Sequence, residues 1–521
     1  MDRLLGMILI LTLLFSCNSS VLEPDNEFPD NALEDVGHEM IVLGERLENP
    51  YTTENMTKAL QSLYPTKSRV ELSPTHLYVR FLPLEESDFD LLDGLDLSDH
   101  PLDYKIVRDG DYYHDPSIDD DDATWQYAVV PHDYVFPDVY YELIDECFIK
   151  ETGGVPRRSG DIDWDAVERE SYRITGNGEV VEPLTKSGKV NPSGRITIVD
   201  EKVNGGKPFG LSGVRIRCNS FVKFSHTYTD RDGYYTIPKK YSSNVRYRIV
   251  FKNEKGFAIG FNKLLVPAST AALGRHSPEG LNYTVTERSE RKLFTRSVVN
   301  NAAYDYISRC SSEDMSITLP PDDLRIWLFQ GMTASSAVML HHGAVVDSKD
   351  ISKFLGGFST VLKFFAPDLT LGMKNKTEYS EIYSDVCHEM AHASHFAQVG
   401  TDYWNRYIKF IIKAFVSSGG NTYGNGNETD AGYCAVGEMW AYYLESLMYK
   451  ERYGGNVPSF GNSFWFSPQI FRALDQRGIK RSDILLALAP DVSDVRILRT
   501  RLLAMFPAKT GIINQVFNRY R

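Results

Sequence analysis

The chain has 521 residues, of which 42% are hydrophobic and 24% are charged. This composition is typical of globular proteins and excludes an intrinsically disordered chain, and the length suffices for roughly two to four domains. The net charge of −14 provides no basic surface for a phosphate backbone, so we expect no nucleic acid partner.

The chain begins with MDRLLGMILILTLLFSCNSS, in which Arg3 precedes an apolar run from Leu4 to Phe15. This run is too short to cross a bilayer comfortably and is typical of a secretory signal peptide. Its end, Leu14-Phe15-Ser16-Cys17, resembles the lipobox of bacterial lipoproteins. The resemblance implies that residues 1–17 form a lipoprotein signal peptide and that Cys17 carries the lipid anchor. We then expect a chain attached to a membrane of the cell envelope, facing the periplasm or the surface; the alternative is an ordinary signal peptide.

The other five cysteines are isolated along the chain and form no C-x-x-C pair: Cys147, Cys218, Cys310, Cys387 and Cys434. An odd number leaves at least one thiol free in an oxidising compartment. We expect buried free thiols, with a bridge between Cys387 and Cys434 as the alternative.

Residues 18–190 predict a mixed domain of unknown role. Apolar residues at helical spacing run from Leu33 to Leu47, and a shorter helix is predicted near Met56–Leu63. The segments His76–Pro83 and Trp125–Pro131 alternate between apolar and polar residues, as strands do.

Residues 191–265 predict a small β-sandwich of short, closely spaced strands. The Asp232-Gly233 pair is expected to form a tight turn between two alternating runs. The run HTYTDRDGYYTIP, from His226 to Pro238, resembles the T-D-x-D-G-x-Y-x-I signature of carboxypeptidase regulatory-like domains. This resemblance implies a transthyretin-like sandwich that serves as a spacer or docking unit and has no catalytic residues.

Residues 266–521 are long enough for a catalytic domain. A helix is predicted near Val298–Ile307, and strands are predicted at Leu324–Phe329 and Asp368–Met373. The stretch YSDVCHEMAHASHF follows directly, and we expect a second helix there that is capped by Thr377 or Ser380 and ends at Gly400.

This stretch contains the pattern H-E-x-x-H at His388, Glu389 and His392. Residues four apart lie on the same face of a helix, so the two imidazoles can bind one metal ion. Glu389 is expected to accept a proton from a water that the ion activates. His395 lies about 10 Å along the axis from His388 and is expected to serve packing or to support a ligand.

A third ligand is expected from the helical segment GYCAVGEMWAYYLESLMYKERYG further along the chain. Glu438 stands there among apolar residues, where an unpaired carboxylate is costly. With this Glu the sequence resembles the gluzincins, in which H-E-x-x-H is followed by a helical Glu, and the resemblance implies that zinc is held by His388, His392 and Glu438. Two features depart from thermolysin: the longer spacing to Glu438, and Tyr442 in place of an Asp that orients a ligand His. Glu445 is the alternative third ligand.

A donor to the tetrahedral oxyanion is also required. Tyr433, five residues before Glu438, is placed like the Tyr that serves some gluzincins, and a packing role is the alternative. His341 and His342 form a weaker candidate pair.

The expected protein is an α+β multidomain chain with a mixed N-terminal domain, a β-sandwich and a mainly helical, zincin-like C-terminal domain. We expect a lipid-anchored zinc endopeptidase that acts on protein or peptide. The alternative is a non-catalytic surface lipoprotein that binds protein or glycan on a zincin-like scaffold.

Overall fold

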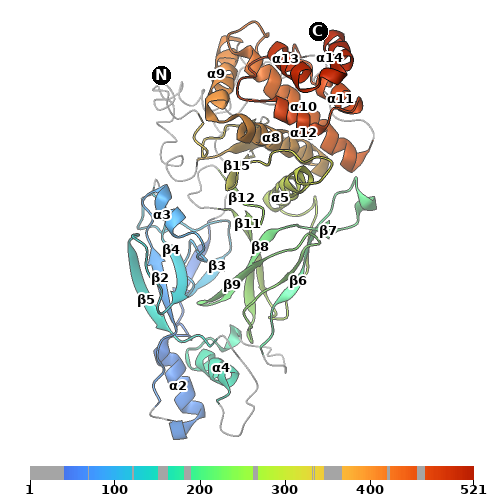
Figure 1. Ribbon diagram of the computed structural model, residues 1–521. Helices are drawn as coiled ribbons and strands as arrows, with labels where there is room; N and C mark the ends of the chain where they lie inside the picture. Colours follow the sequence, from blue (N-terminus) through green and yellow to red (C-terminus); the bar gives the residue numbers. More distant parts are fainter. Residues whose placement is uncertain are drawn as a thin grey trace.

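The computed structural model describes residues 40–520 except 68–69, 120–121, 151–161, 181–188, 262–267, 331–332, 334, 345–365, 419–422 and 455–463. The chain is a mixed α+β protein with several sheets, as expected. Figure 1 shows the C-terminal helices at one end, strands in the middle and the helices α2 and α4 at the other end. The predicted signal peptide and Cys17 lie outside the described residues.

The N-terminal region contains two small sheets. One pairs β1 (Val42–Arg46) with β3 (Tyr104–Arg108), and the other has the order β4 (Gln126–Pro131), β2 (His76–Phe81), β5 (Tyr141–Cys147). Its helices are α2 (Thr53–Leu63), α3 (Glu86–Leu91) and α4 (Trp164–Ile174). The predictions of a short helix near 56–63 and of strands at 76–83 and 125–131 are therefore confirmed.

The helical prediction for residues 33–47 is wrong in its described part, because Val42–Arg46 forms strand β1. The backbone of β1 pairs with β3, more than fifty residues further along the chain. The spacing of apolar residues over so short a segment fits both the period of a helix and the period of a strand. Pairing with β3 therefore determines that this segment forms a strand.

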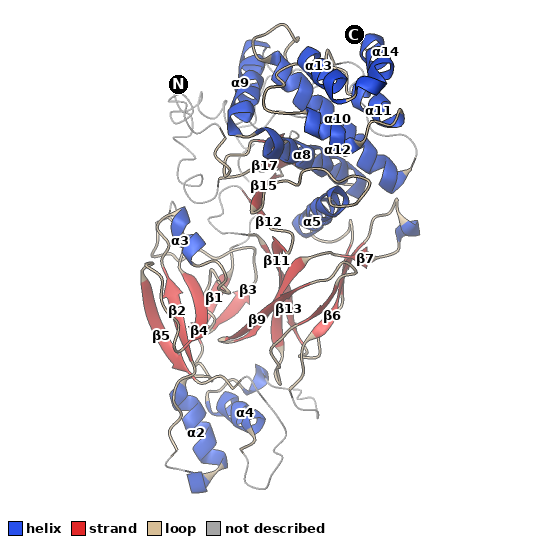
Figure 2. Cartoon of the chain, in the orientation of Figure 1, coloured by secondary structure: helices blue, strands red, loops and turns tan. Residues whose placement is uncertain are grey.

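The middle of the chain is rich in strands, shown red in Figure 2. The strands are β6 (Ser193–Ile198), β7 (Phe209–Gly210), β8 (Val214–Ser220), β9 (Lys223–Tyr228), β10 (Tyr234–Thr236), β11 (Val245–Asn253), β12 (Phe257–Phe261), β13 (Thr270–His276) and β14 (Tyr283–Val285). One sheet has the order β10-β6-β14 with β7 on β6, and the other contains β9, β8, β11 and β13. Side chains such as Ile196, Ile216 and Ile249 are fully buried in the core they share.

The predicted turn at Asp232-Gly233 connects the two sheets. Strand β9 before the turn pairs with β8, whereas β10 after it pairs with β6. Gly233 has φ +84°, and a Cβ there would lie 2.0 Å from the carbonyl oxygen of Ile196. Only glycine fits this crossing.

The second sheet continues into the C-terminal region. β12 pairs in parallel with β15 (Leu324–Phe329), which pairs in parallel with β17 (Leu369–Gly372), and β16 (Ser336–Ala337) is antiparallel to β17. The strands predicted at 324–329 and 368–373 are thus present. The expected domain boundary at residue 265 falls inside this arrangement, since β13 and β14 lie beyond it and pair with earlier strands.

The described residues form eight helices in this C-terminal region: α5 (Arg291–Cys310), α8 (Tyr379–Val399), α9 (Thr401–Ser418), α10 (Ala431–Tyr453), α11 (Gln469–Gln476), α12 (Arg481–Ala487), α13 (Val495–Met505) and α14 (Thr510–Arg519). Helix α8 packs between α5 and α10 and contacts β16 and β17. One hydrophobic core extends from the strands of the two middle sheets into these helices.

The five cysteines within the described residues are all buried, and none of them forms a disulfide with another, as the sequence predicted. None of the described helices combines the length and the apolar character that a membrane-spanning helix requires.

Candidate metal centre

Helix α8 carries the H-E-x-x-H pattern. It begins with a capping box in which Glu378 is the N-cap and Glu381 bonds back to its amide, so neither predicted cap residue is used. It ends at Gly400 with φ +81°, as predicted. The helix is buried along most of its length, so His388 and His392 face the protein interior.

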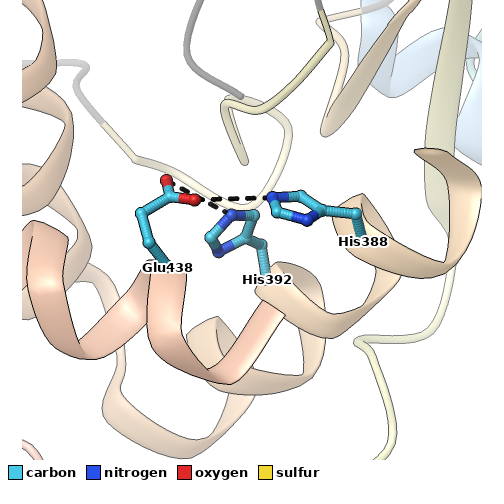
Figure 3. Close-up of side chains that lie close together, drawn as sticks. All are labelled: His388, His392 and Glu438. Atoms are coloured by element: carbon cyan, nitrogen blue, oxygen red, sulfur yellow. Dashed lines mark ion pairs between the residues drawn. The ribbon is translucent and has the colours of Figure 1, made fainter. Parts of the chain in front are cut away.

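Helix α10 packs against α8 and brings Glu438 to the two imidazoles (Figure 3). The Oε2 atom of Glu438 lies 3.4 Å from Nε2 of His388, and its Oε1 atom lies 3.6 Å from Nε2 of His392. One ligand atom from each residue lies within 4.8 Å of the others. This His-His-Glu group can hold a metal ion.

The charge of Glu438 depends on the two histidines beside it. Burial by itself would raise the pKa of Glu438, but the neighbouring His392 and His388 outweigh it and hold the pKa well below its usual range. Burial lowers the pKa of His392. A buried carboxylate between two imidazoles is thus kept ionised, which is the protonation state that a cation needs.

A second set of side chains surrounds these three. The hydroxyl of Tyr407 on α9 donates to Oε1 of Glu438 at 2.6 Å. Nδ1 of His388 lies 3.0 Å from Oε2 of Glu445, whose other oxygen accepts from Ser384 at 2.6 Å. Hydrogen bonds of this kind orient metal ligands in proteins.

Glu445, the alternative third ligand, therefore contacts the opposite nitrogen of His388 from the one that faces Glu438. The sequence did not indicate Tyr407, and its only signal is a place on an apolar helix face between Trp404 and Ile411, both buried. The ring of Tyr442, where thermolysin-like enzymes have Asp, packs edge-on to His388 with centroids 4.6 Å apart.

Glu389 lies beside the group and is 1% exposed. Neither of its carboxylate oxygens has a hydrogen-bond partner among the described residues. Burial, together with the charge of Glu438, raises the pKa of Glu389 to about 8, against the opposing effect of His388. Such a shift marks a group suited to proton transfer near neutral pH.

The other candidates, Tyr433, His395 and the pair His341 and His342, lie outside the His-His-Glu group. The ring of Tyr433 packs against Tyr403, with centroids 4.6 Å apart, and beside Arg406. Five residues of helix separate Tyr433 from Glu438, so the two side chains project from α10 in directions about 140° apart. The oxyanion role of Tyr433 stays a prediction.

His395 is fully buried between Tyr403 and Trp404, and burial lowers its pKa to about 3. This placement agrees with the packing role expected for it. His341 contacts the carboxylates of Glu86 and Asp323, at 3.1 and 3.2 Å. His342 contacts Asp368 at 2.9 Å.

Comparison of the chain with models of known protein families, with curated proteins and with solved structures gave no match. The site itself therefore carries the functional argument. Among the described residues, this mixed α+β protein has one buried His-His-Glu group that can bind a metal ion.

Proposed function

We propose that the protein is a zinc-dependent endopeptidase, exported and attached to a membrane of the cell envelope through lipid on Cys17. The observation that carries the proposal is the convergence of His388, His392 and Glu438 beside the unbonded carboxylate of Glu389. Two imidazoles and one carboxylate form the ligand set of a catalytic zinc site with a position left for water. Zinc, once bound there, would lower the pKa of a coordinated water toward 7.

The residues of the chain have separate roles in this proposal. His388, His392 and Glu438 hold the ion. Glu445 accepts a hydrogen bond from Nδ1 of His388, which leaves Nε2 of that ring available as a ligand atom. Glu389 accepts the proton that the attacking water releases and later passes it to the leaving amine.

The centre is shielded from solvent, because His388 is 4% exposed and Glu438 is fully buried. Cleavage of a polypeptide therefore requires the site to open to its substrate. An assay with an unbiased peptide library measures whether it does, because a site that stays closed cuts none of the peptides.

The proposal is tested by measuring zinc content and library cleavage on four variants beside the wild type. We expect about one zinc per chain in the wild type and none in His392→Ala, with the exposed His132→Ala as the matched control. Glu389→Gln should keep its zinc and lose about 10²- to 10⁴-fold in turnover, since only the base is removed. Glu438→Gln should lose zinc, because a charged ligand has been neutralised.

Full zinc in His392→Ala contradicts the metal site. If the wild type binds zinc but cuts no peptide, the alternative of a non-catalytic binding lipoprotein replaces the peptidase. The lipid anchor is tested separately: Cys17→Ser should leave the protein soluble or unprocessed, and a correctly cleaved variant that stays on the membrane contradicts lipidation.

A further inference from the structure

A second group of buried charges lies where helix α4 meets the strands of the middle region. It consists of two carboxylates and two lysines: Asp165, Glu168, Lys189 and Lys223. The carboxylates lie on α4, Lys189 lies four residues before β6, and Lys223 begins β9. Figure 1 shows α4 at the end of the molecule away from the C-terminal helices, so this group has no part in the proposed zinc chemistry.

The distances within this group are short. The Nζ atom of Lys189 lies 2.5 Å from Oε2 of Glu168 and 3.0 Å from Oδ1 of Asp165. A carbonyl bond is about 1.2 Å long, so this nitrogen is at most about 4.2 Å from the carboxyl carbon of Asp165. Atoms that react with each other stand about 3 to 3.5 Å apart before they do so. A small shift of one side chain therefore brings the amine onto this carbon.

Water has little access to the group. The side chains of Lys189 and Lys223 are each 1% exposed, and that of Glu168 is 4% exposed. The buried hydroxyl of Tyr51 donates to Oε1 of Glu168 at 2.7 Å. Asp165 is the most exposed of the four charged residues, at 14%. A water molecule released at Asp165 can therefore leave, whereas bulk water does not surround the lysines.

The four charges make the resting state costly, because ions lose their hydration on burial even when they are paired. Burial by itself would lower the pKa of Lys189, but the neighbouring Glu168 and Asp165 outweigh it and raise the pKa. Lys189 is therefore an ammonium that must give up a proton before it can act as a nucleophile. Loss of Lys189 and Asp165 as charges would leave Lys223 and Glu168 as a matched pair, 3.4 Å apart.

We propose that Lys189 and Asp165 condense to an isopeptide bond within the folded chain. The bond from Nζ of Lys189 to Cγ of Asp165 forms, and one carbon–oxygen bond of Asp165 breaks. The ammonium loses two protons, and Glu168 carries them one after the other to the departing oxygen, which leaves as water. An ammonium and a carboxylate together contain the atoms and the charge of one amide and one water, so no further reactant takes part.

The bond joins α4 of the N-terminal region to the segment that leads into β6. Within the described residues the cysteines form no disulfide with one another, so this link is a covalent constraint of another kind. A link between distant positions restricts the unfolded chain, as a disulfide does.

The test is mass spectrometry of the full-length protein and of its tryptic peptides. Trypsin does not cut after a lysine whose Nζ is acylated. We therefore expect residues 159–169 and residues 187–195 in one branched peptide, lighter by one water than the two peptides together. Fragmentation of the branched peptide should place the link on Asp165 and not on Glu168.

Three variants separate the roles of the residues. Lys189→Arg keeps the positive charge but has no amine that condenses, and Asp165→Ala lacks the carbon that is attacked. Both should give unlinked peptides, and their intact masses should exceed that of the wild type by one water beyond the substitution itself. Glu168→Gln cannot carry the protons, so most of its chains should stay unlinked.

Lys202 provides a matched control in the same digest. Its Nζ atom also lies 2.5 Å from a carboxylate, that of Glu378, but the two side chains are 48% and 47% exposed. Water keeps both ions hydrated there, so we expect no link between Lys202 and Glu378.

The proposal is overturned if the wild-type digest contains the separate peptides in place of the branched one. A link on Glu168 in place of Asp165 also overturns it, as does a fully linked Glu168→Gln. A link between Lys202 and Glu378 contradicts the role given to burial. Thermal unfolding checks that the variants fold, and if one of them does not, the wild-type digest still decides.

Discussion

The Nδ1 atom of His388 lies 3.0 Å from Oε2 of Glu445, which is seven residues beyond the expected ligand Glu438 on the same helix. The two carboxylates of α10 thus contact opposite nitrogens of one imidazole. Glu438 faces Nε2, the nitrogen available to a metal, and Glu445 contacts Nδ1 on the other side of the ring.

This relationship predicts different effects of two substitutions on zinc affinity. Glu445→Gln should weaken zinc about 10- to 100-fold, because it removes a charged partner of a ligand and not a ligand itself. Glu438→Gln should weaken it considerably more. Competition with a chelator of known affinity measures both. If Glu445→Gln is the more damaging of the two, Glu445 is the third ligand.

A second prediction concerns the stability of the metal-free protein. Because burial raises the pKa of Glu389 to about 8, the folded chain retains a proton that the unfolded chain releases near its ordinary value of 4.5. The folded state binds more protons between these two pH values, so its stability falls as the pH rises through that window. Replacing Glu389 by a residue that does not titrate abolishes this dependence of the stability on pH.

Glu389→Gln should therefore be more stable than the wild type above about pH 5. The gain should grow up to pH 8 and reach the order of a few kcal/mol, and it should vanish below pH 4.5, where both states are protonated. Urea unfolding of chelator-treated protein across this range measures it. An equal difference at every pH would mean that Glu389 does not titrate in this window.

A third prediction separates two tyrosines. Tyr407→Phe removes the hydroxyl that donates to Glu438, so zinc affinity should fall by about 10-fold or more. Tyr433→Phe should leave zinc affinity unchanged, because Tyr433 packs against Tyr403. If Tyr433 also supplies the oxyanion donor, its variant should lose about 10²-fold in kcat at full zinc content. An unchanged kcat leaves Tyr433 with a packing role.

A fourth prediction concerns the contact of the N-terminal region with strand β11. The Asp109 carboxylate pairs with Arg246 at 2.6 Å and also with Arg248, which is 2% exposed. Asp109→Asn would leave a buried guanidinium without its charge partner and should cost about 3 to 5 kcal/mol of unfolding free energy. Chemical unfolding measures the loss.

The matched control is Glu54→Gln, which removes an exposed pair with Lys58 at 2.6 Å. It should leave the unfolding free energy almost unchanged, because water screens an exposed pair. A small effect of Asp109→Asn as well would show that Arg248 finds another partner.

The sequence by itself determined the features that lie within one element. His388 and His392 share a helix face because they are four residues apart, and Gly400 ends that helix because it can adopt positive φ. The strands at Leu324–Phe329 and Asp368–Met373 were also predicted, because the pattern of residues that indicates a strand lies within the strand itself. Glu438 was also expected, from its apolar neighbours and from the resemblance to gluzincins.

Only the tertiary structure decided which elements meet. Sequence spacing left Glu438 and Glu445 both open as ligands, because the side of His388 that each contacts depends on how α10 packs against α8. Tyr407 reaches Glu438 from a third helix, and no local pattern indicates that contact. Strand β1 likewise formed where a helix was expected, because backbone pairing with β3 was available only in the folded chain. Local propensity is a weak preference of a few tenths of a kcal/mol per residue, and packing between distant elements outweighs it.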